Sequence, residues 1–380
     1  MTNTDTAACG RARLCVDLSR LVGNYRLLTS RLLACGSEPI AVVKANAYGH
    51  GQEAVAGALA AAGATRFAVS SLDEGLALRR TLPFAEILVL GYVPPAGIGE
   101  AARAALTLSI HSLGYAKTVS HLAGRPISVH IKLNSGMNRA GFPLHPAAFD
   151  ASIEGVLAAA ALPALRPSGI YSHLATAEDG GSPHTARQLA RFRAALLALS
   201  RRGLVLPAHL SATAAVLGGT LPAFRFARLG LGLYGYTPTG EDAGLLPIAR
   251  LSADIVESYT LPRGEAVGYG ATYVTTRRER LGILGIGYAD GLPRAAEGAY
   301  VRVGGVPCPL VGRISMDASA VLLTGAPRHA RTALIFGERA DDLYRLAARC
   351  GTIPYEILSR LGNRVVREYR YGEDYGSCDP

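Results

Sequence analysis

Lys44 is the first residue whose type and position together suggest chemistry. It follows the apolar run 40–43 and precedes Ala-Asn-Ala-Tyr-Gly-His-Gly at 45–51. An amine at the end of an apolar strand is partly removed from water, which lowers its pKa and suits it to Schiff-base formation or general base catalysis. Position alone leaves a second interpretation open, in which the lysine extends to solvent and has no chemical role.

Further polar residues follow or end other apolar runs of the first 240 residues. They are Lys132, Asn134, Arg139, His173, Ser211, Thr213 and Arg228. One histidine at a strand end is usually structural, but seven polar residues on one rim indicate a binding site. The glycines at 230, 232 and 235 lie near the hydroxyls of Thr213 and Tyr48. Together they could bind a phosphate through backbone N–H groups, although this glycine pattern by itself is weak evidence.

The elements that must position these residues form a repeating pattern between about 38 and 235. Short apolar runs alternate with Ala/Leu-rich helical stretches such as 53–62, 71–80, 115–122 and 184–201. Eight such strands predict an α/β fold, a TIM-type (β/α)8 barrel over residues 1–240, with a doubly wound open sheet as the alternative. The expected strands are Ile40–Lys44, Arg66–Ser70, Glu86–Leu90, Thr107–His111, Ser128–Leu133, Gly169–His173, Pro207–Leu210 and Phe226–Leu229.

After Pro238 the pattern changes to short strands separated by Gly and Pro. This predicts a second, mostly β domain over residues 241–380, with helices only near 340–349 and 353–361. Residues 11–18 read as a strand that lies outside the barrel and associates with the β domain. The strands expected in the second domain are Ile255–Tyr259, Arg280–Ile286, Tyr300–Val303, Val306–Val311, Ser319–Leu323 and Val365–Tyr371.

Composition excludes several classes of protein. The net charge is +10, but the arginines are scattered, so we expect a solvated basic surface and no nucleic-acid partner. No run reaches the ~18 apolar residues of a membrane span, and residues 1–10 lack the apolar core of a signal peptide. The six cysteines show no metal-ligand spacing, so we expect free thiols, no metal and a cytoplasmic location.

Several motifs across the chain resemble those of the alanine racemases. The run 41–51, Ala-Val-Val-Lys-Ala-Asn-Ala-Tyr-Gly-His-Gly, is similar to the cofactor-lysine signature of that family. Coincidence is negligible because the other motifs follow in the order of the family. They are 132–141 (KLNSGMNRAG), 171–177 (YSHLATA), 227–235 (ARLGLGLYG), 267–273 (VGYGATY), 286–291 (IGYADG) and 311–317 (VGRISMD).

The resemblance implies pyridoxal 5'-phosphate, a small amino-acid substrate and a two-base racemisation within a head-to-tail homodimer. Lys44 would hold the cofactor and act on one face of the substrate, and Tyr269 of the partner subunit would act on the other. A free phenol has a pKa near 10, so such a base needs positive charge nearby. Arg228 would face the pyridine nitrogen and keep its own proton, which makes the cofactor a milder electron sink and disfavours transamination.

The resemblance also assigns residues around the cofactor and at the entrance. Tyr48, Thr213 and Gly230 would bind the phosphate, and His173 would lie beside the ring. Arg139 would lie near the phenolate and the substrate carboxylate. Less direct roles fall to Lys132, which would be carbamylated and orient Arg139, and to His209 beside Arg228. In the β domain, Met316, Asp317, Tyr288 and Arg313 would come from the partner.

Three departures from the family pattern leave the substrate open. Asn134 stands where the family usually has Asp, and Ala212-Thr213 replaces a common Asn-Ser pair. Asn363, expected at the cofactor, stands where several relatives carry Tyr, so a smaller side chain could admit serine.

The function expected is interconversion of L- and D-alanine for peptidoglycan. The alternatives are a serine or broader racemase, a barrel-type amino-acid decarboxylase, and a non-catalytic cofactor-binding protein.

Overall fold

The computed structural model describes residues 10–179, 181–218 and 224–372. Eight parallel strands form a closed barrel, because β10 pairs with β2 and β5 pairs with β6. Closure confirms the TIM-type barrel and excludes the open sheet. The barrel strands are β2 (Glu38–Val42), β3 (Arg66–Val69), β4 (Glu86–Val89), β5 (Thr107–Ile110), β6 (Ile127–Asn134), β8 (Leu165–Tyr171), β9 (Ala208–Ala212) and β10 (Phe226–Leu229).

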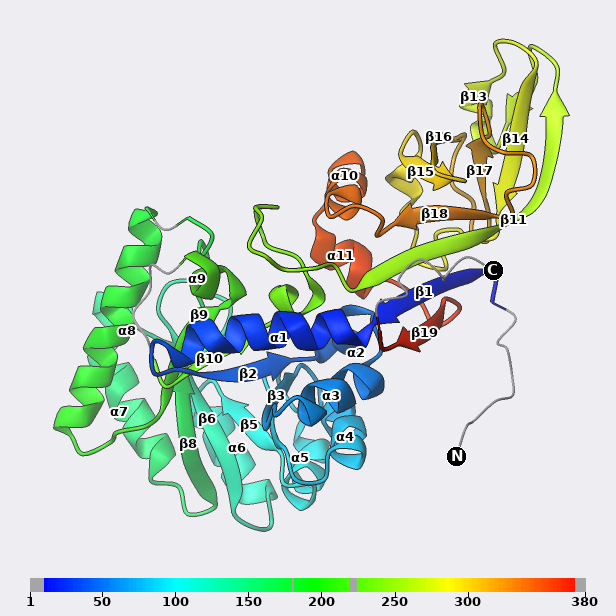
Figure 1. Cartoon of the computed structure of the whole chain (residues 1–380). Coiled ribbons are helices and arrows are strands. Elements are labelled where there is room, and N and C mark those ends of the chain that lie inside the picture. The colour runs from blue at the N-terminus through cyan, green and yellow to red at the C-terminus, as the bar shows by residue number, and fades with distance from the viewer. Residues whose placement is uncertain (1–9, 180, 219–223, 373–380) are drawn as a thin grey trace.

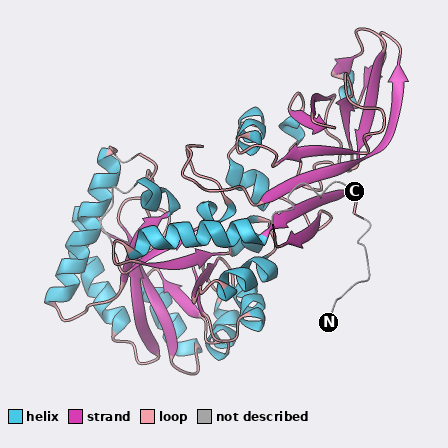
Figure 2. Ribbon diagram, in the orientation of Figure 1, coloured by secondary structure: helices cyan, strands magenta, loops and turns pink. Residues whose placement is uncertain are grey.

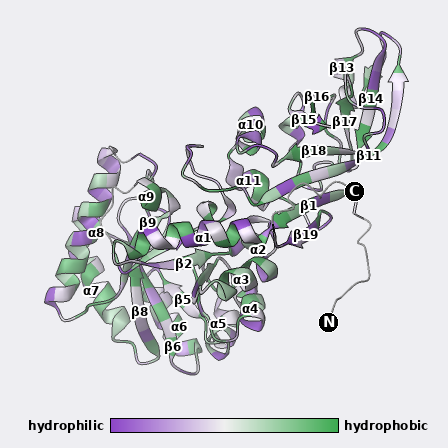
Figure 3. Cartoon of the chain, viewed as in Figure 1, coloured by the Kyte–Doolittle hydropathy of each residue, from purple (hydrophilic) through white to green (hydrophobic). Residues whose placement is uncertain are grey.

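Helices surround the barrel (Figures 1 and 2). They are α1 (Leu18–Leu33), α3 (Gln52–Ala61), α4 (Leu72–Thr81), α5 (Pro95–Arg103), α6 (Leu113–Leu122), α7 (Phe149–Ala160), α8 (Pro183–Arg201) and α9 (Thr213–Gly218). Helices α1 and α8 carry both hydrophobic and hydrophilic residues in Figure 3, as expected for helices with one face on the barrel. Local sequence sets their starts: the Ser71 side chain caps α4, and Glu74 completes a capping box.

The second sheet has eight strands in the order β14-β17-β16-β15-β18-β11-β1-β19. It extends from one side of the barrel, with β13 and β14 at its far end (Figure 1). This confirms the mostly β region after the barrel. Its strands are β1 (Ala12–Asp17), β11 (Ala249–Leu261), β14 (Glu279–Leu284), β15 (Tyr300–Val303), β16 (Val306–Val311), β17 (Ser319–Leu322), β18 (Thr332–Phe336) and β19 (Val366–Arg370).

Strand β1 precedes the barrel in sequence but belongs to the second sheet. It pairs antiparallel with β11 and parallel with β19. Two helices, α10 (Asp342–Arg349) and α11 (Pro354–Ser359), lie between this sheet and the barrel in Figure 1. The remaining short elements are α2 (Lys44–Tyr48), β7 (Phe142–Pro143), η1 (Pro146–Ala148), η2 (Leu231–Tyr234), β12 (Ala266–Val267), η3 (Tyr269–Ala271), β13 (Tyr273–Val274) and η4 (Arg294–Ala296).

Three expectations from the sequence were wrong in detail. The first barrel strand ends at Val42, and Lys44 begins a separate turn, α2, because the backbone changes there from the extended to the left-handed conformation. Strand β11 runs to thirteen residues, since it spans two sets of partners, β1 and β18 at one end and β14 at the other. Cys15 is disulfide-bonded, whereas Cys35, Cys308 and Cys350 are free thiols. Within the described ranges, no helix is long and apolar enough to cross a membrane.

Asn24 ties α1 to the segment that leaves the barrel. Its side chain is buried, and its amide donates to the carbonyls of Leu233 at 3.1 Å and Leu246 at 2.8 Å. Its Oδ1 accepts the N–H of Leu246 at 2.9 Å. One side chain therefore satisfies three backbone groups of the chain between β10 and β11, which fixes where the second sheet begins.

We expect Asn24→Ala to lower the free energy of unfolding by about 2–4 kcal/mol, because buried backbone groups lose their partners. Urea denaturation followed by circular dichroism measures the change. Arg26→Ala, an exposed position on the same helix, is the matched control and should stay within about 0.5 kcal/mol of wild type. Equal stability of the two variants would contradict this role of Asn24.

Candidate active site

The polar residues singled out in the barrel lie at one end of it. Lys44 follows β2, Lys132 lies near the end of β6, and His173 follows β8. Thr213 follows β9, and Arg228 lies in β10. Because all eight strands are parallel, their carboxyl ends share one mouth of the barrel, where such barrels place their active sites.

Lys44 opens a turn of left-handed backbone. Ala45, Asn46 and Ala47 have φ of 51–53° and ψ of 47–52°, and Tyr48 has φ of 53°. Left-handed helical backbone costs a non-glycine residue about 1–2 kcal/mol. The turn is held by hydrogen bonds from the N–H of Ala47 to the Val43 carbonyl and from the N–H of Gly49 to the Ala45 carbonyl, both at 2.9 Å. Such strain is typical of functional sites, where packing and hydrogen bonds compensate it.

Arg228 is a buried cation at the base of the mouth. Its Nη2 donates to the carbonyls of Ser172 at 2.8 Å and Leu210 at 3.1 Å. Its two terminal nitrogens also donate to the Nδ1 atoms of His209 at 2.6 Å and His173 at 3.0 Å. Burial lowers the pKa of Arg228 to about 10, so the guanidinium stays charged at neutral pH. Within the described part of the chain, its Nε–H has no protein acceptor and is left for a ligand.

Arg228 determines which ring nitrogens of the adjoining histidines donate hydrogen bonds and which accept them. A guanidinium only donates, so Nδ1 of His209 accepts, and its proton is assigned to Nε2. That N–H then donates to Nδ1 of His130 at 2.9 Å. Burial, followed by the charge of Arg228, lowers the pKa of His130 to about 4 and of His173 to about 3. These rings are therefore neutral at pH 7, and Arg228 keeps the charge.

Positive charge is concentrated around Lys44. Burial first, and then the charges of Arg139 and Arg228, lower the pKa of the Lys44 amine, while Glu74 opposes them. Burial and the same two arginines, with Lys44 behind them, lower the pKa of Lys132 to about 8. Four cationic side chains at one site favour an anionic ligand. This donor set fits a phosphorylated, phenolic cofactor.

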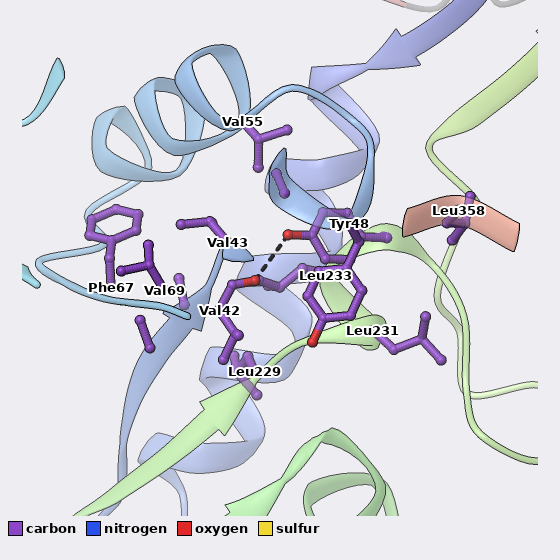
Figure 4. Packing of buried hydrophobic residues seen from close by; sticks show 14 of the residues in the cluster. Val42, Val43, Tyr48, Val55, Phe67, Val69, Leu229, Leu231, Leu233 and Leu358 are labelled. Atoms are coloured by element: carbon purple, nitrogen blue, oxygen red, sulfur yellow. Dashed lines mark hydrogen bonds between the residues drawn. The ribbon is translucent and has the colours of Figure 1, made fainter. Parts of the chain in front are cut away.

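The phenol of Tyr48 lies against the glycine-rich segment after β10. A Cβ added to Gly230 would lie 2.9 Å from the Tyr48 hydroxyl oxygen, so only glycine fits there. Thr213 Oγ1 accepts the N–H of Gly230 at 3.0 Å. The Tyr48 ring packs at 4.8 Å from that of Tyr234, within the apolar cluster of Figure 4. Tyr48, Thr213 and Gly230 are thus brought together beside the Lys44 turn.

The residues expected from the β domain lie on exposed surface. Tyr269, Met316 and Tyr288 are 69%, 53% and 43% exposed. Tyr269 begins η3, which directly precedes β13 in the chain, and Figure 1 shows β13 far from α2, the turn that carries Lys44. A single chain therefore does not bring Tyr269 to Lys44. A Cβ placed on Gly270 would lie 3.0 Å from Arg313 Nη1, so Arg313 adjoins the Tyr269 segment.

Arg364, the residue after Asn363, forms an ion pair with Asp317. The Arg364 guanidinium donates to Asp317 Oδ1 at 2.7 Å and to Asp290 Oδ1 at 2.8 Å. The segment 361–365 is in turn fixed by Arg367, whose Nε donates to the Gly49 carbonyl at 2.8 Å, next to the Lys44 turn. Its terminal nitrogens donate to the carbonyls of Leu361, Gly362 and Val365 at 2.8–2.9 Å. Asn363 therefore lies on a segment attached to the barrel mouth of its own chain.

Several residues of the site were not singled out from the sequence. His130 bonds to His209, and the Tyr171 ring stacks on His209 at 4.7 Å while its hydroxyl bonds to Ser109 at 2.8 Å. A Cβ on Gly169 would lie 2.6 Å from the His130 ring, so that glycine makes room for it. Glu74 contacts the Lys44 turn, and its only sequence signal is the capping box. Lone histidines and helix caps are ordinarily structural, so the sequence offered no reason to select them.

The chain is similar to known racemases over nearly its whole length. It is 39% identical over 366 residues to an alanine racemase of Azoarcus sp., covering 93% of this chain and 98% of the relative. It is 37% identical to a catabolic alanine racemase of Pseudomonas putida, covering 94% and 98%.

Solved structures agree. The biosynthetic alanine racemase of Pseudomonas aeruginosa superposes with a TM-score of 0.83 at 36% identity, covering 95% of this chain and 99% of that one. The alanine racemase of Bartonella henselae with covalently bound pyridoxal phosphate gives 0.84 at 29% identity, covering 95% and 99%. Residues 16–238 match the family model for the N-terminal domain of alanine racemase and residues 248–369 that for the C-terminal domain, so the chain belongs to the alanine racemase family.

Proposed function

We propose that this protein is a pyridoxal-phosphate-dependent racemase that interconverts L- and D-alanine. The observation that carries the proposal is the buried Arg228 guanidinium, whose Nε–H is left for a ligand at the barrel mouth that holds Lys44. The names of the relatives support alanine as the substrate, and the Bartonella structure supports the cofactor. We propose that the product D-alanine supplies peptidoglycan synthesis, and the cytoplasmic location expected from the sequence stays a prediction.

The residues of the barrel mouth suit this cofactor. We assign Lys44 to its covalent attachment, Arg228 Nε to the ring nitrogen and His173 to the ring beside it. Tyr48, Thr213 and Gly230 would bind the phosphate, and the surrounding cations would balance its charge. When bound, pyridoxal phosphate delocalises the electrons left behind when the Cα proton of an amino acid departs. Because Arg228 keeps its own proton, it would donate a hydrogen bond to the ring nitrogen without protonating it, which would limit that delocalisation and favour return of the proton to Cα.

Lys44 is suited to act as one base. Its pKa is lowered by burial and by Arg139 and Arg228, so more of the amine is neutral near pH 7 than in water. We assign Arg139 to the substrate carboxylate, because its guanidinium is exposed at the mouth while its charge still reaches Lys44 and Lys132. Lys132, when carbamylated, would carry the negative charge that orients Arg139.

The second base is Tyr269 of the partner subunit. Tyr269, Met316 and Tyr288 are exposed in a single chain, and the Arg313 guanidinium lies beside Gly270, the residue after Tyr269. A homodimer that buries this surface on the partner's barrel mouth would complete two sites. Asp317, held by Arg364, and Tyr288 would then lie at each entrance. On this basis we place the domain boundary near residue 240, with 1–240 binding the cofactor and 241–380 completing the partner's site.

Asn363 favours serine as a second substrate. Its segment is attached through Arg367 to Gly49, next to the turn that carries Lys44. A short amide leaves room for a hydroxymethyl group. The decarboxylase and the non-catalytic alternatives are distinguished by product, since one would release carbon dioxide and the other would leave the Cα proton in place.

The proposal is tested by loss of Cα deuterium from labelled alanine. Wild-type protein with pyridoxal phosphate should exchange deuterium and interconvert the enantiomers without releasing carbon dioxide. Lys44→Ala should lose covalent cofactor attachment and lower kcat by at least about 1,000-fold, because it removes both the anchor and one base. Lys117→Ala is the matched lysine control and should retain covalent cofactor attachment and the wild-type kcat. Cofactor binding without exchange in wild-type protein would overturn the proposal.

Tyr269→Phe should suppress exchange from one enantiomer far more than from the other, because each base serves one face. Mixing Lys44→Ala and Tyr269→Phe dimers and allowing subunit exchange should restore roughly a quarter of wild-type activity, since half of the dimers then hold one intact site. Absence of any recovery would show that Tyr269 does not act across the interface. Equal loss of deuterium exchange from the two enantiomers would contradict a mechanism in which each base serves one face.

Asn363→Tyr should lower kcat/KM for serine by about tenfold or more while changing that for alanine by less than about threefold, because the larger side chain fills the space of the hydroxymethyl group. Arg360→Ala, an exposed change at the residue directly after α11, is the control. Parallel assays of both amino acids measure the ratio. A wild-type serine value about 1,000-fold or more below that for alanine would contradict serine as a second substrate.

A further inference from the structure

The carboxylate of Glu74 joins the turn that carries Lys44 to the neighbouring barrel strand. Oε1 accepts the N–H of Ala45, the residue after Lys44, at 2.7 Å. Oε2 accepts the N–H groups of Ser70 at 2.7 Å and Ser71 at 3.3 Å, between β3 and α4. One ionised side chain therefore bridges the ends of two adjacent strands, and charge-assisted hydrogen bonds of this kind are stronger than neutral ones.

The bridge reaches a strained segment of the site, the left-handed turn Ala45–Tyr48. Hydrogen bonds within and around the turn satisfy the N–H groups of Ala47, Gly49 and Gly51. The N–H of Ala45 instead points to Glu74. Loss of that acceptor would leave the first residue of a left-handed turn free to relax, and the backbone of Lys44 would move with it. A displacement of about 1 Å at a reacting group is enough to lower a rate by orders of magnitude.

Glu74 also differs in charge from the other groups that act on Lys44. Arg139 and Arg228 lower the pKa of the Lys44 amine, and Glu74 raises it. Lys132 and His173 face the same amine and feel its charge. Among the described groups that shift Lys44, Glu74 is the only carboxylate. Its removal would therefore alter both the geometry and the proton affinity of the lysine.

We propose that Glu74 is a positioning residue for Lys44, which fixes the left-handed turn through the Ala45 amide and keeps the lysine amine aimed into the barrel mouth. The proposal rests on the function proposed above for Lys44. It goes beyond that function by giving a role in the site to a residue whose sequence signal is only a helix cap.

Four substitutions separate this role from its alternatives. Glu74→Gln removes the charge and leaves one side-chain oxygen, so it cannot serve all three N–H groups. Glu74→Asp keeps the charge but is one methylene too short to bridge the strands. Ser71→Ala removes the side chain that caps α4, since Ser71 Oγ accepts the Glu74 N–H at 3.3 Å. This variant keeps the hydrogen bond between the Glu74 carboxylate and the Ala45 N–H. Asp73→Asn removes one charge from the same turn of α4 and is the charge control.

Two readouts on the full-length protein do not depend on turnover. Hydrogen–deuterium exchange of the segment 44–48 should become at least tenfold faster in Glu74→Gln and Glu74→Asp, and should stay at the wild-type rate in Ser71→Ala and Asp73→Asn. The pH midpoint for capture of added pyridoxal phosphate by Lys44, fixed by hydride reduction, should fall by about 0.5–1 pH unit in Glu74→Gln, because a nearby negative charge is lost. Glu74→Asp should keep the wild-type midpoint.

Activity gives a third readout. Glu74→Gln should lower kcat about tenfold or more and change KM by less than about threefold, since a displaced base affects the reaction more than binding. Exchange in the segment 44–48 that is equally fast in Ser71→Ala and Glu74→Gln would overturn the proposal, because Glu74 would then act only through the helix cap. If wild-type protein fails to capture pyridoxal phosphate at Lys44, the proposed function fails, while the exchange comparison still tests the bridge.

Discussion

The constraint on which the site depends is the burial of the Arg228 guanidinium inside the barrel. A buried charge is costly unless its N–H groups are satisfied. Two backbone carbonyls and two neutral histidines satisfy the terminal nitrogens. Those histidines must remain unprotonated, because a second charge beside Arg228 would be repelled. The low pKa of His173 and His209 is thus a consequence first of burial and then of the charge of Arg228.

The same charge affects the lysines of the mouth. Burial first, and then the charges of Arg139 and Arg228, lower the pKa values of Lys44 and Lys132, and among the described groups Glu74 is the carboxylate that opposes the effect on Lys44. A site with this excess of cations gains stability when an anion enters it. The net charge of +10 does not by itself describe the site, since the arginines are scattered along the whole chain.

The strained turn after Lys44 is held in place by contacts with other parts of the chain. A regular helix after β2 would have continued the barrel pattern, but the left-handed backbone turns the chain back toward β10, where Tyr48 meets Gly230. The C-terminal segment supports this turn from outside. Arg367 donates to the Gly49 carbonyl, and a Cβ on Gly49 would lie 2.0 Å from the Leu358 carbonyl oxygen. The last strand and helix of the chain therefore brace the first loop of the barrel.

The sequence by itself determined the fold class, the order of the barrel strands and the polar residues at their ends. Periodic apolar runs and the residues that follow them are local properties, so Lys44, His173 and Arg228 were found without a structure. The role of each side chain in the reaction came from the family motifs, and those assignments stay predictions.

Only the tertiary structure decided which of these groups meet. His130 and His209 are 79 residues apart in sequence, and Arg364 and Asp317 are 47 apart. Their contacts are set by the register of barrel closure and by the path of the C-terminal segment. The left-handed backbone at Ala45–Tyr48 could not be predicted, because alanine ordinarily avoids it. Glu74 shows the same limit: the sequence determined its place in a helix cap, and the packing of α4 beside the Lys44 turn gave its carboxylate a second partner.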